Sequence, residues 1–151
     1  MTTKQRIETD LKQAMLAGDK PLTTTLRGLK STILYAEVAK GSRDEGLKED
    51  DVIELLGKEA KKRQESADLF DRGGNTVKAQ EERDEKKIIE AYLPAQMSDE
   101  ELNLIIDEVI SSLEVSGPQA MGQAIRSVKQ RVGGQADGGR IASAVKEKLN
   151  A

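Results

Sequence analysis

The residues best suited to chemistry are basic side chains near the end of the chain, which could bind phosphate groups. Residues 117–151 contain six bases and two acids, a net charge of 6 − 2 = +4, whereas residues 95–116 contain six acids and no base. A basic surface without aromatic side chains suits contact with the backbone and shape of folded RNA better than stacking on single-stranded bases. A solvated helix face is the plain alternative. The candidate nucleic-acid-binding residues are Arg126, Lys129, Arg131, Gly138, Arg140 and Lys146.

Gly138 belongs to the densest glycine segment, residues 133–139. One interpretation is a helix end, a short turn and Asp137 as the N-cap of a last helix. The other is a loop whose backbone amides approach a phosphate at that helix N-terminus. Gly138 and Gly139 in a first helical turn cost about 1 kcal/mol each relative to alanine, which favours a role beyond capping. The segment is not a P-loop, because no Gly-Lys-Ser/Thr follows it.

A second polar group lies on helix faces where apolar residues are expected. Arg63 interrupts the apolar stripe of the helix expected over residues 49–72, and Glu81 and Glu85 interrupt the stripe of the next helix. An antiparallel turn centred on Gly74 places Arg63 opposite Glu85. The residue types would allow an acid/base or ligand-binding centre, but a charge-assisted structural pair is the preferred interpretation. Arg63→Ala should then cost about 3–5 kcal/mol, as for a buried pair that loses one partner.

Several classes of chemistry are excluded by composition. The chain has no cysteine and no histidine, so disulfides, zinc thiolate sites and histidine catalysis are ruled out, as are carboxylate di-metal sites that need Glu-x-x-His pairs. We find no activated nucleophile and no nucleotide-binding loop, and therefore expect no enzyme activity, no cofactor and no metal. No apolar run approaches the ~18 residues that a membrane span needs, and residues 1–6 have no apolar signal core. The sequence predicts a cytoplasmic protein with no membrane partner.

The elements that must position these residues are helices. Charged residues make up 34% of the chain and aromatic residues only 2%, a balance that favours helix over strand. Apolar residues recur at helical spacing, and Gly or Pro interrupts the pattern between segments. We expect an all-α protein with an N-terminal bundle of four helices over residues 1–94 and a smaller three-helix domain over residues 95–151. The expected helices cover about 3–17, 21–41, 49–72, 77–93, 99–116, 118–132 and 137–149.

Short motifs in this order resemble the GatB/YqeY family over essentially the whole chain. Together they are specific, although each alone is not. They are Arg27-Gly28-Leu29-Lys30, Lys61-Lys62-Arg63-Gln64-Glu65-Ser66 with Phe70, Glu81 and Glu85 leading to Tyr92-Leu93-Pro94-Ala95-Gln96, Met121-Gly122, and Gly134-Gln135-Ala136-Asp137-Gly138 before the stripe Ile141, Val145 and Leu149.

The resemblance implies a helical bundle with a small three-helix domain. It also implies kinship with the tail of the B subunit of the tRNA-dependent amidotransferase, which is similar to an RNA-recognition appendage. The catalytic cradle for ATP, magnesium and the aminoacyl end lies elsewhere in that subunit and has no counterpart here. A carbon–nitrogen ligase activity assigned by homology would therefore be inherited from the longer protein. The basic residues proposed above come from this sequence and not from the family.

Two hypotheses of different class follow. The first is a non-catalytic tRNA-binding accessory module that contacts tRNA phosphates through the basic side of the C-terminal domain. The second is a protein-interaction module that docks through the long helices onto an aminoacyl-tRNA synthetase or amidotransferase without touching RNA. The first depends on the bases of the last two helices facing outward without neutralising carboxylates.

Overall fold

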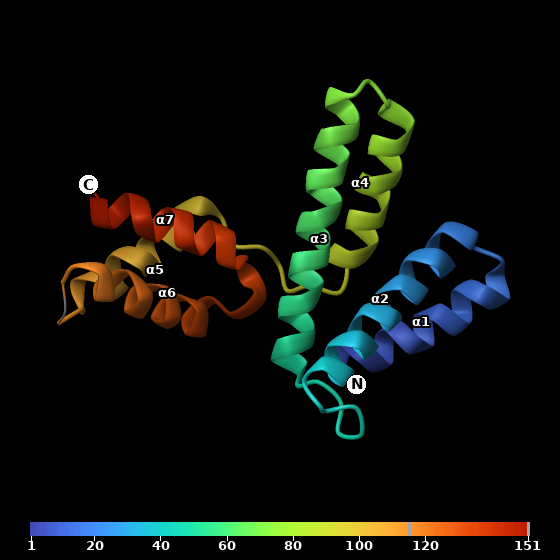
Figure 1. Ribbon diagram of the computed structural model, residues 1–151, viewed down its shortest axis with the longest axis horizontal. Coiled ribbons are helices and arrows are strands. Elements are labelled where there is room, and N and C mark those ends of the chain that lie inside the picture. Colours follow the sequence, from blue (N-terminus) through green and yellow to red (C-terminus); the bar gives the residue numbers. More distant parts are fainter. Residues whose placement is uncertain (115, 151) are drawn as a thin grey trace. The chain divides into compact units, whose positions relative to one another are not determined.

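The computed structural model describes residues 1–114 and 116–150, and over this range the chain is helical without any strand, which confirms the all-α prediction (Figure 1). A short 3-10 turn, η1 (Gly133–Gln135), precedes the last helix. The helices are α1 (Thr3–Ala17), α2 (Lys20–Ala39), α3 (Glu49–Arg72), α4 (Thr76–Glu90), α5 (Asp99–Ser111), α6 (Pro118–Val132) and α7 (Gly138–Asn150).

Local sequence sets where these helices begin and end. Ser98 and Glu101 form a capping box at the start of α5, with the Glu101 amide donating to Ser98 Oγ at 3.1 Å. α1 ends at Gly18, whose φ of 70° is a left-handed conformation that glycine adopts without strain. α4 ends at Glu90, earlier than the expected residue 93, because proline at position 94 has no amide to donate to the Glu90 carbonyl; the Leu93 amide bonds that carbonyl instead, in a tighter turn.

The chain divides into two compact units, Met1–Leu93 and Pro94–Ala151. Each unit has its own hydrophobic core, built from residues of that unit alone. The units are described separately below.

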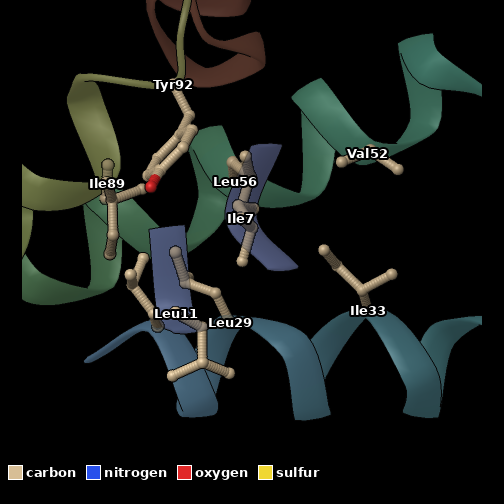
Figure 2. Close-up of a cluster of buried hydrophobic side chains, with 10 residues drawn as sticks. Ile7, Leu11, Leu29, Ile33, Val52, Leu56, Ile89 and Tyr92 are labelled. Atoms are coloured by element: carbon tan, nitrogen blue, oxygen red, sulfur yellow. The ribbon is translucent and has the colours of Figure 1, made fainter. Parts of the chain in front are cut away.

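Unit 1 consists of two helical hairpins, α1–α2 and α3–α4, that meet only near one end (Figure 1). The shared core uses the beginning of α3 and the end of α4, so the four helices do not share a core along their full length as a simple bundle would. The remainder of the α3–α4 hairpin projects beyond this core. Figure 2 shows the shared cluster, which includes Ile7, Leu11, Leu29, Ile33, Val52, Leu56, Ile89 and Tyr92.

Two polar contacts fix the ends of the hairpins in unit 1. Glu37 is 1% exposed and accepts hydrogen bonds from Lys4 Nζ at 3.0 Å and from the Leu47 amide at 2.9 Å. Tyr92, which follows α4, reaches into the core (Figure 2). Its hydroxyl donates to Asp10 Oδ2 at 2.5 Å. These contacts join α1 to the end of α2 and to the end of the α3–α4 hairpin.

Unit 2 packs α5, α6 and α7 around a core of small and β-branched side chains. On α6 the buried stripe is Ala120, Ala124, Val128 and Val132, and Met121 and Ile125 are partly buried beside it. Alanine at two of these positions lets α6 approach its neighbours closely. The outer faces of α6 and α7 are left to polar and basic residues.

Candidate functional site

The structure brings Arg63 and Glu85 together between α3 and α4. Arg63 Nε donates to Glu85 Oε2 at 2.8 Å, and Arg63 Nη1 donates to Glu59 Oε2 at 3.1 Å. The Arg63 side chain is 23% exposed, so the pair is half-buried rather than fully buried. The antiparallel turn at Gly74 therefore gives the register expected from the sequence.

Glu81 does not belong to this cluster, which corrects the sequence interpretation. Its side chain is exposed, and Glu59 and Glu82 take its place around Arg63. Burial and the nearby Glu85 and Glu81 carboxylates raise the pKa of Glu82 above its ordinary value, against the lowering effect of Arg63. Glu82 was missed because positions three and four residues before Glu85 both lie one helical turn away from it, and the sequence interpretation took the fourth, Glu81, instead of the third.

The arrangement of potential metal ligands was compared over residues 1–114 and 116–150. No group of three or more potential ligands is arranged around a common point there. In the same part of the chain, every buried side-chain nitrogen and oxygen has a hydrogen-bond partner. The arrangement of Arg63 with its carboxylates is that of a structural ion-pair network.

The glycine segment connects α6 to α7 and is held by the start of unit 2. The Met97 amide donates to the Gln135 carbonyl at 2.7 Å, and Gln96 Nε2 donates to the Gly134 carbonyl at 3.2 Å. Asp137 Oδ1 accepts the Arg140 amide at 3.0 Å and caps α7. These contacts account for the loop as a connection between two helices, and they give Gln96 of the Tyr-Leu-Pro-x-Gln motif a structural role.

Three bases of unit 2 face acids of α5. Arg131 Nη2 contacts Glu108 at 2.6 Å, and Lys148 Nζ contacts Asp107 at 3.0 Å. Arg140 Nη2 contacts Asp99 at 2.8 Å and also donates to the Met97 carbonyl at 2.9 Å. The expected separation of an acidic helix from an outward basic side therefore fails for Arg131 and Arg140.

This correction has a simple physical cause. The acids of α5 and the bases of α6 and α7 are far apart in sequence. The three helices pack side by side, however, so their opposite charges lie close together where α5 contacts α6 and α7. Counting charges along the chain cannot detect this pairing. Unit 2 as a whole contains six bases and eight acids, a net charge of 6 − 8 = −2 over residues 94–151.

Three of the expected bases remain exposed on the other side of α6 and α7. No described carboxylate forms an ion pair with Arg126, Lys129 or Lys146. A Cβ placed on Gly138 would lie 3.4 Å from Lys129 Nζ, so the Lys129 ammonium group lies against the start of α7. We call these three bases the α6–α7 basic surface.

Helical periodicity places the three bases of this surface on the same side of unit 2. On α6, Arg126 and Lys129 are one turn apart, and a rotation of about 160° separates Arg131 from Lys129. On α7, Arg140 and Lys148 lie on the side that contacts α5, and a rotation of about 160° separates Lys146 from Lys148. α6 and α7 contain only one acid, Glu147. The side away from α5 is therefore cationic although the unit is acidic.

A protein-family comparison agrees with the arrangement of motifs along the chain. The family model described as "Yqey-like protein" matches residues 4–149, nearly the full length. The chain belongs to the YqeY-like family. The resemblance stated from the motifs is thereby confirmed.

Curated relatives of this YqeY-like chain carry the name altered inheritance of mitochondria protein 41, mitochondrial. The one from Eremothecium gossypii is 37% identical over 59% of this chain and 48% of its own length. Those from Kluyveromyces lactis and Clavispora lusitaniae are 32% and 30% identical, over 74% and 73% of this chain and 60% and 64% of their own lengths. The match thus spans about half to two thirds of each relative.

The expected cytoplasmic location is contradicted by these names, because all three relatives are described as mitochondrial. That expectation depended on the lack of cysteines and of an apolar leader. Neither feature distinguishes one reducing compartment from another. No described helix is long and apolar enough to cross a bilayer.

Proposed function

We propose that this YqeY-like protein is a non-catalytic accessory module that binds tRNA phosphates through the α6–α7 basic surface. Arg126, Lys129 and Lys146 would each contact the backbone of a folded RNA. Discrimination would come from the shape of the RNA, because the surface has no aromatic side chain to read or stack on bases.

The observation that carries the proposal is the one-sided charge of α6 and α7. The three bases of this surface are exposed, while three of the five acids of α5, Asp99, Asp107 and Glu108, pair with other bases. A phosphate chain approaching the α6–α7 basic surface meets three cations that form no ion pair with a described carboxylate, and Glu147 is the one acid within α6 and α7. The net negative charge of unit 2 keeps the expected binding weak.

Arg131 and Arg140 are left out of this surface, although the sequence included both. Each would have to leave a carboxylate on α5 before binding a phosphate. An exposed ion pair of this kind contributes only about 0–1 kcal/mol, so breaking it would cost little. The positive charge gained for phosphate binding would also be small, because the carboxylate that is left behind stays nearby. Gly138 contributes by leaving room for the Lys129 side chain.

The absence of catalysis is part of the proposal and is supported by two features. The resemblance to the amidotransferase B subunit is to its tail and not to its catalytic cradle. Among the described residues, every buried side-chain nitrogen and oxygen has a hydrogen-bond partner. We place the module in translation, as a partner of tRNA and of the enzymes that charge or amidate it.

A titration of fluorescently labelled tRNA at low salt tests the proposal. Arg126→Ala, Lys129→Ala and Lys146→Ala should each weaken binding, by about threefold to tenfold, because each removes one phosphate contact. The triple variant should bind no more tightly than a protein without a specific site. All three positions are exposed, so thermal unfolding should be unchanged.

Two control variants make the test specific to the α6–α7 basic surface. Lys12→Ala removes one exposed charge from α1, and Arg131→Ala removes a base already paired with Glu108. Both should bind tRNA like the original protein within about twofold. An equal loss in controls and surface variants, or no tRNA binding by the original protein, would refute the proposal.

A further inference from the structure

The outer face of α2 carries an apolar patch that the core of unit 1 does not use. Leu34, Tyr35 and Val38 are 42%, 73% and 55% exposed. Their spacing brings them together within about one helical turn. The buried stripe of the same helix is on the opposite side and includes Leu26, Leu29 and Ile33. We call the three exposed residues the α2 apolar patch.

The same face of α2 is basic toward the helix N-terminus. Lys20, Arg27 and Lys30 are exposed, and no described carboxylate forms an ion pair with any of them. The only acid of α2 is Glu37, which is buried and held by Lys4 and the Leu47 amide. Arg27, Lys30 and the α2 apolar patch therefore form one strip along α2 with positive charge at one end.

Gly28 leaves a gap in the middle of this strip. It is exposed, and a Cβ built there would meet nothing within 4 Å. Glycine in a helix interior costs about 1 kcal/mol relative to alanine, and no neighbour within unit 1 requires it. A residue without a side chain at this point lets a second helix approach α2 closely.

We propose that this strip is a docking surface for an acidic amphipathic helix of a partner protein. A helix lying along α2 would bury its leucine-like side chains on the α2 apolar patch and place its carboxylates against Arg27 and Lys30. Tyrosine and arginine are the residue types that most often dominate binding energy at protein interfaces. The cationic end supplies charge complementarity, which selects an acidic partner and speeds its approach.

The chemistry of the strip favours a protein over a nucleic acid. Leu34 and Val38 offer no hydrogen bond or charge to a phosphate chain, and burying them against a solvated backbone would gain little. Against the apolar face of a helix, the same side chains gain about 25 cal/mol for each Å² removed from water. The strip lies in unit 1 and shares no residue with the α6–α7 basic surface, so it does not depend on the proposed RNA binding.

Fluorescence anisotropy with a synthetic peptide tests the docking surface on the 151-residue protein. The probe is a labelled helical peptide with leucines at i, i+3, i+4 and i+7 and glutamates on the flanking positions. The comparison peptide has the same composition in scrambled order. We expect the helical peptide to bind more tightly than the scrambled one by about tenfold or more. Equal binding of the two peptides, or no binding at low salt, would overturn the proposal.

Substitutions locate the peptide on α2. Tyr35→Ala should weaken binding by about tenfold or more, and Lys30→Glu should weaken it by a similar factor that shrinks as salt is raised. The matched controls are Leu69→Ala, an exposed leucine of α3, and Lys12→Glu on α1; both should bind the peptide normally. The triple variant that disrupts tRNA binding should also bind the peptide normally.

Two further results would count against the docking surface. Loss of binding with Lys30→Glu but not with Tyr35→Ala would show charge attraction without docking. A loss of tRNA affinity with Tyr35→Ala would assign the strip to RNA instead. Because the substituted positions are exposed, unchanged thermal unfolding of each variant separates a binding defect from misfolding.

Discussion

At the scale of single residues, Glu37 shows how a buried charge is stabilised in unit 1. Burial by itself raises the pKa of Glu37, but the hydrogen bonds from Lys4 and the Leu47 amide and the charge of Lys4 outweigh it and set the pKa below the ordinary 4.5. Gly46 lies beside this carboxylate with a φ of 81°, and a Cβ there would come within 3.1 Å of Glu37 Oε2. Position 46 thus requires glycine both for its positive φ and for the close approach of the Glu37 carboxylate.

The lowered pKa of Glu37 predicts a pH-dependent stability. A carboxyl that ionises more easily in the folded state stabilises the protein above pH 4.5, and this contribution is lost as the pH falls below that value. At pH 7, Glu37→Gln should lower the free energy of unfolding by about 1.5–3 kcal/mol, which is the usual contribution of a hydrogen bond to a charged group. Urea unfolding at several pH values measures the difference, which should close at acidic pH.

The exposed loop residue Glu45 provides the control for this prediction. Glu45→Gln should unfold like the original protein at every pH. A Glu37→Gln variant that is as stable as the original at pH 7, or whose deficit grows in acid, would contradict the assigned role of Glu37.

At the scale of elements, the α3–α4 hairpin depends on polar contacts beyond the shared core. Ala67 and Ala79 are its buried apolar residues there, and Arg63, Glu59 and Glu85 supply the directional contacts. Without Arg63, the 7%-exposed Glu59 would lose one of its two ion pairs and keep the one with Lys62. The network therefore sets the register of two helices that have few apolar contacts to do so.

Arg63→Ala should lower the free energy of unfolding by about 2–3 kcal/mol. This is less than the ~3–5 kcal/mol expected from the sequence for a fully buried pair, because nearly a quarter of the Arg63 side chain is exposed to solvent, which screens the interaction. Chemical denaturation measures the loss. Glu81→Ala, on the exposed side of α4, should change the value by less than about 0.5 kcal/mol. An unchanged midpoint for Arg63→Ala would refute the network.

At the scale of the whole molecule, the distribution of charge matters more than its sum. The protein has a net charge of −3, yet α2 and the α6–α7 pair each present a face with bases and without an exposed partner acid. The first face is accompanied by apolar side chains and the second is not. This difference leads to the assignment of one to a protein partner and the other to RNA.

The salt dependence of tRNA binding by the 151-residue protein follows from the α6–α7 basic surface. Three phosphate contacts give a slope of about −2 to −3 for the logarithm of the binding constant against the logarithm of salt concentration. If Arg131 and Arg140 also bound phosphates, the slope would be about −3.5 to −4.5. Titrations at four or more salt concentrations distinguish these values, and binding that is indifferent to salt would exclude phosphate contacts altogether.

Much of the fold could be predicted from local rules. Helical spacing of apolar residues, the Ser98–Glu101 capping box and the breaks at Gly18 and Pro94 place the helices to within a few residues. Counting facing positions across the antiparallel turn correctly predicted that Arg63 pairs with Glu85. The same count was wrong by one residue for the second carboxylate on α4, because it predicted Glu81 where the structure has Glu82. The candidate site was harder, because it depends on which faces of separate helices meet.

The sequence by itself determined the helical class, the family and the pool of charged residues, since these follow from composition, spacing and short motifs. Tertiary structure decided which of those charges remain available. The packing of α5 against α6 and α7 pairs Arg131 and Arg140 with carboxylates and leaves Arg126 and Lys129 exposed. The physical reason is range: helix formation depends on neighbours within a few residues, whereas ion pairing depends on distances in space that only the packed helices define.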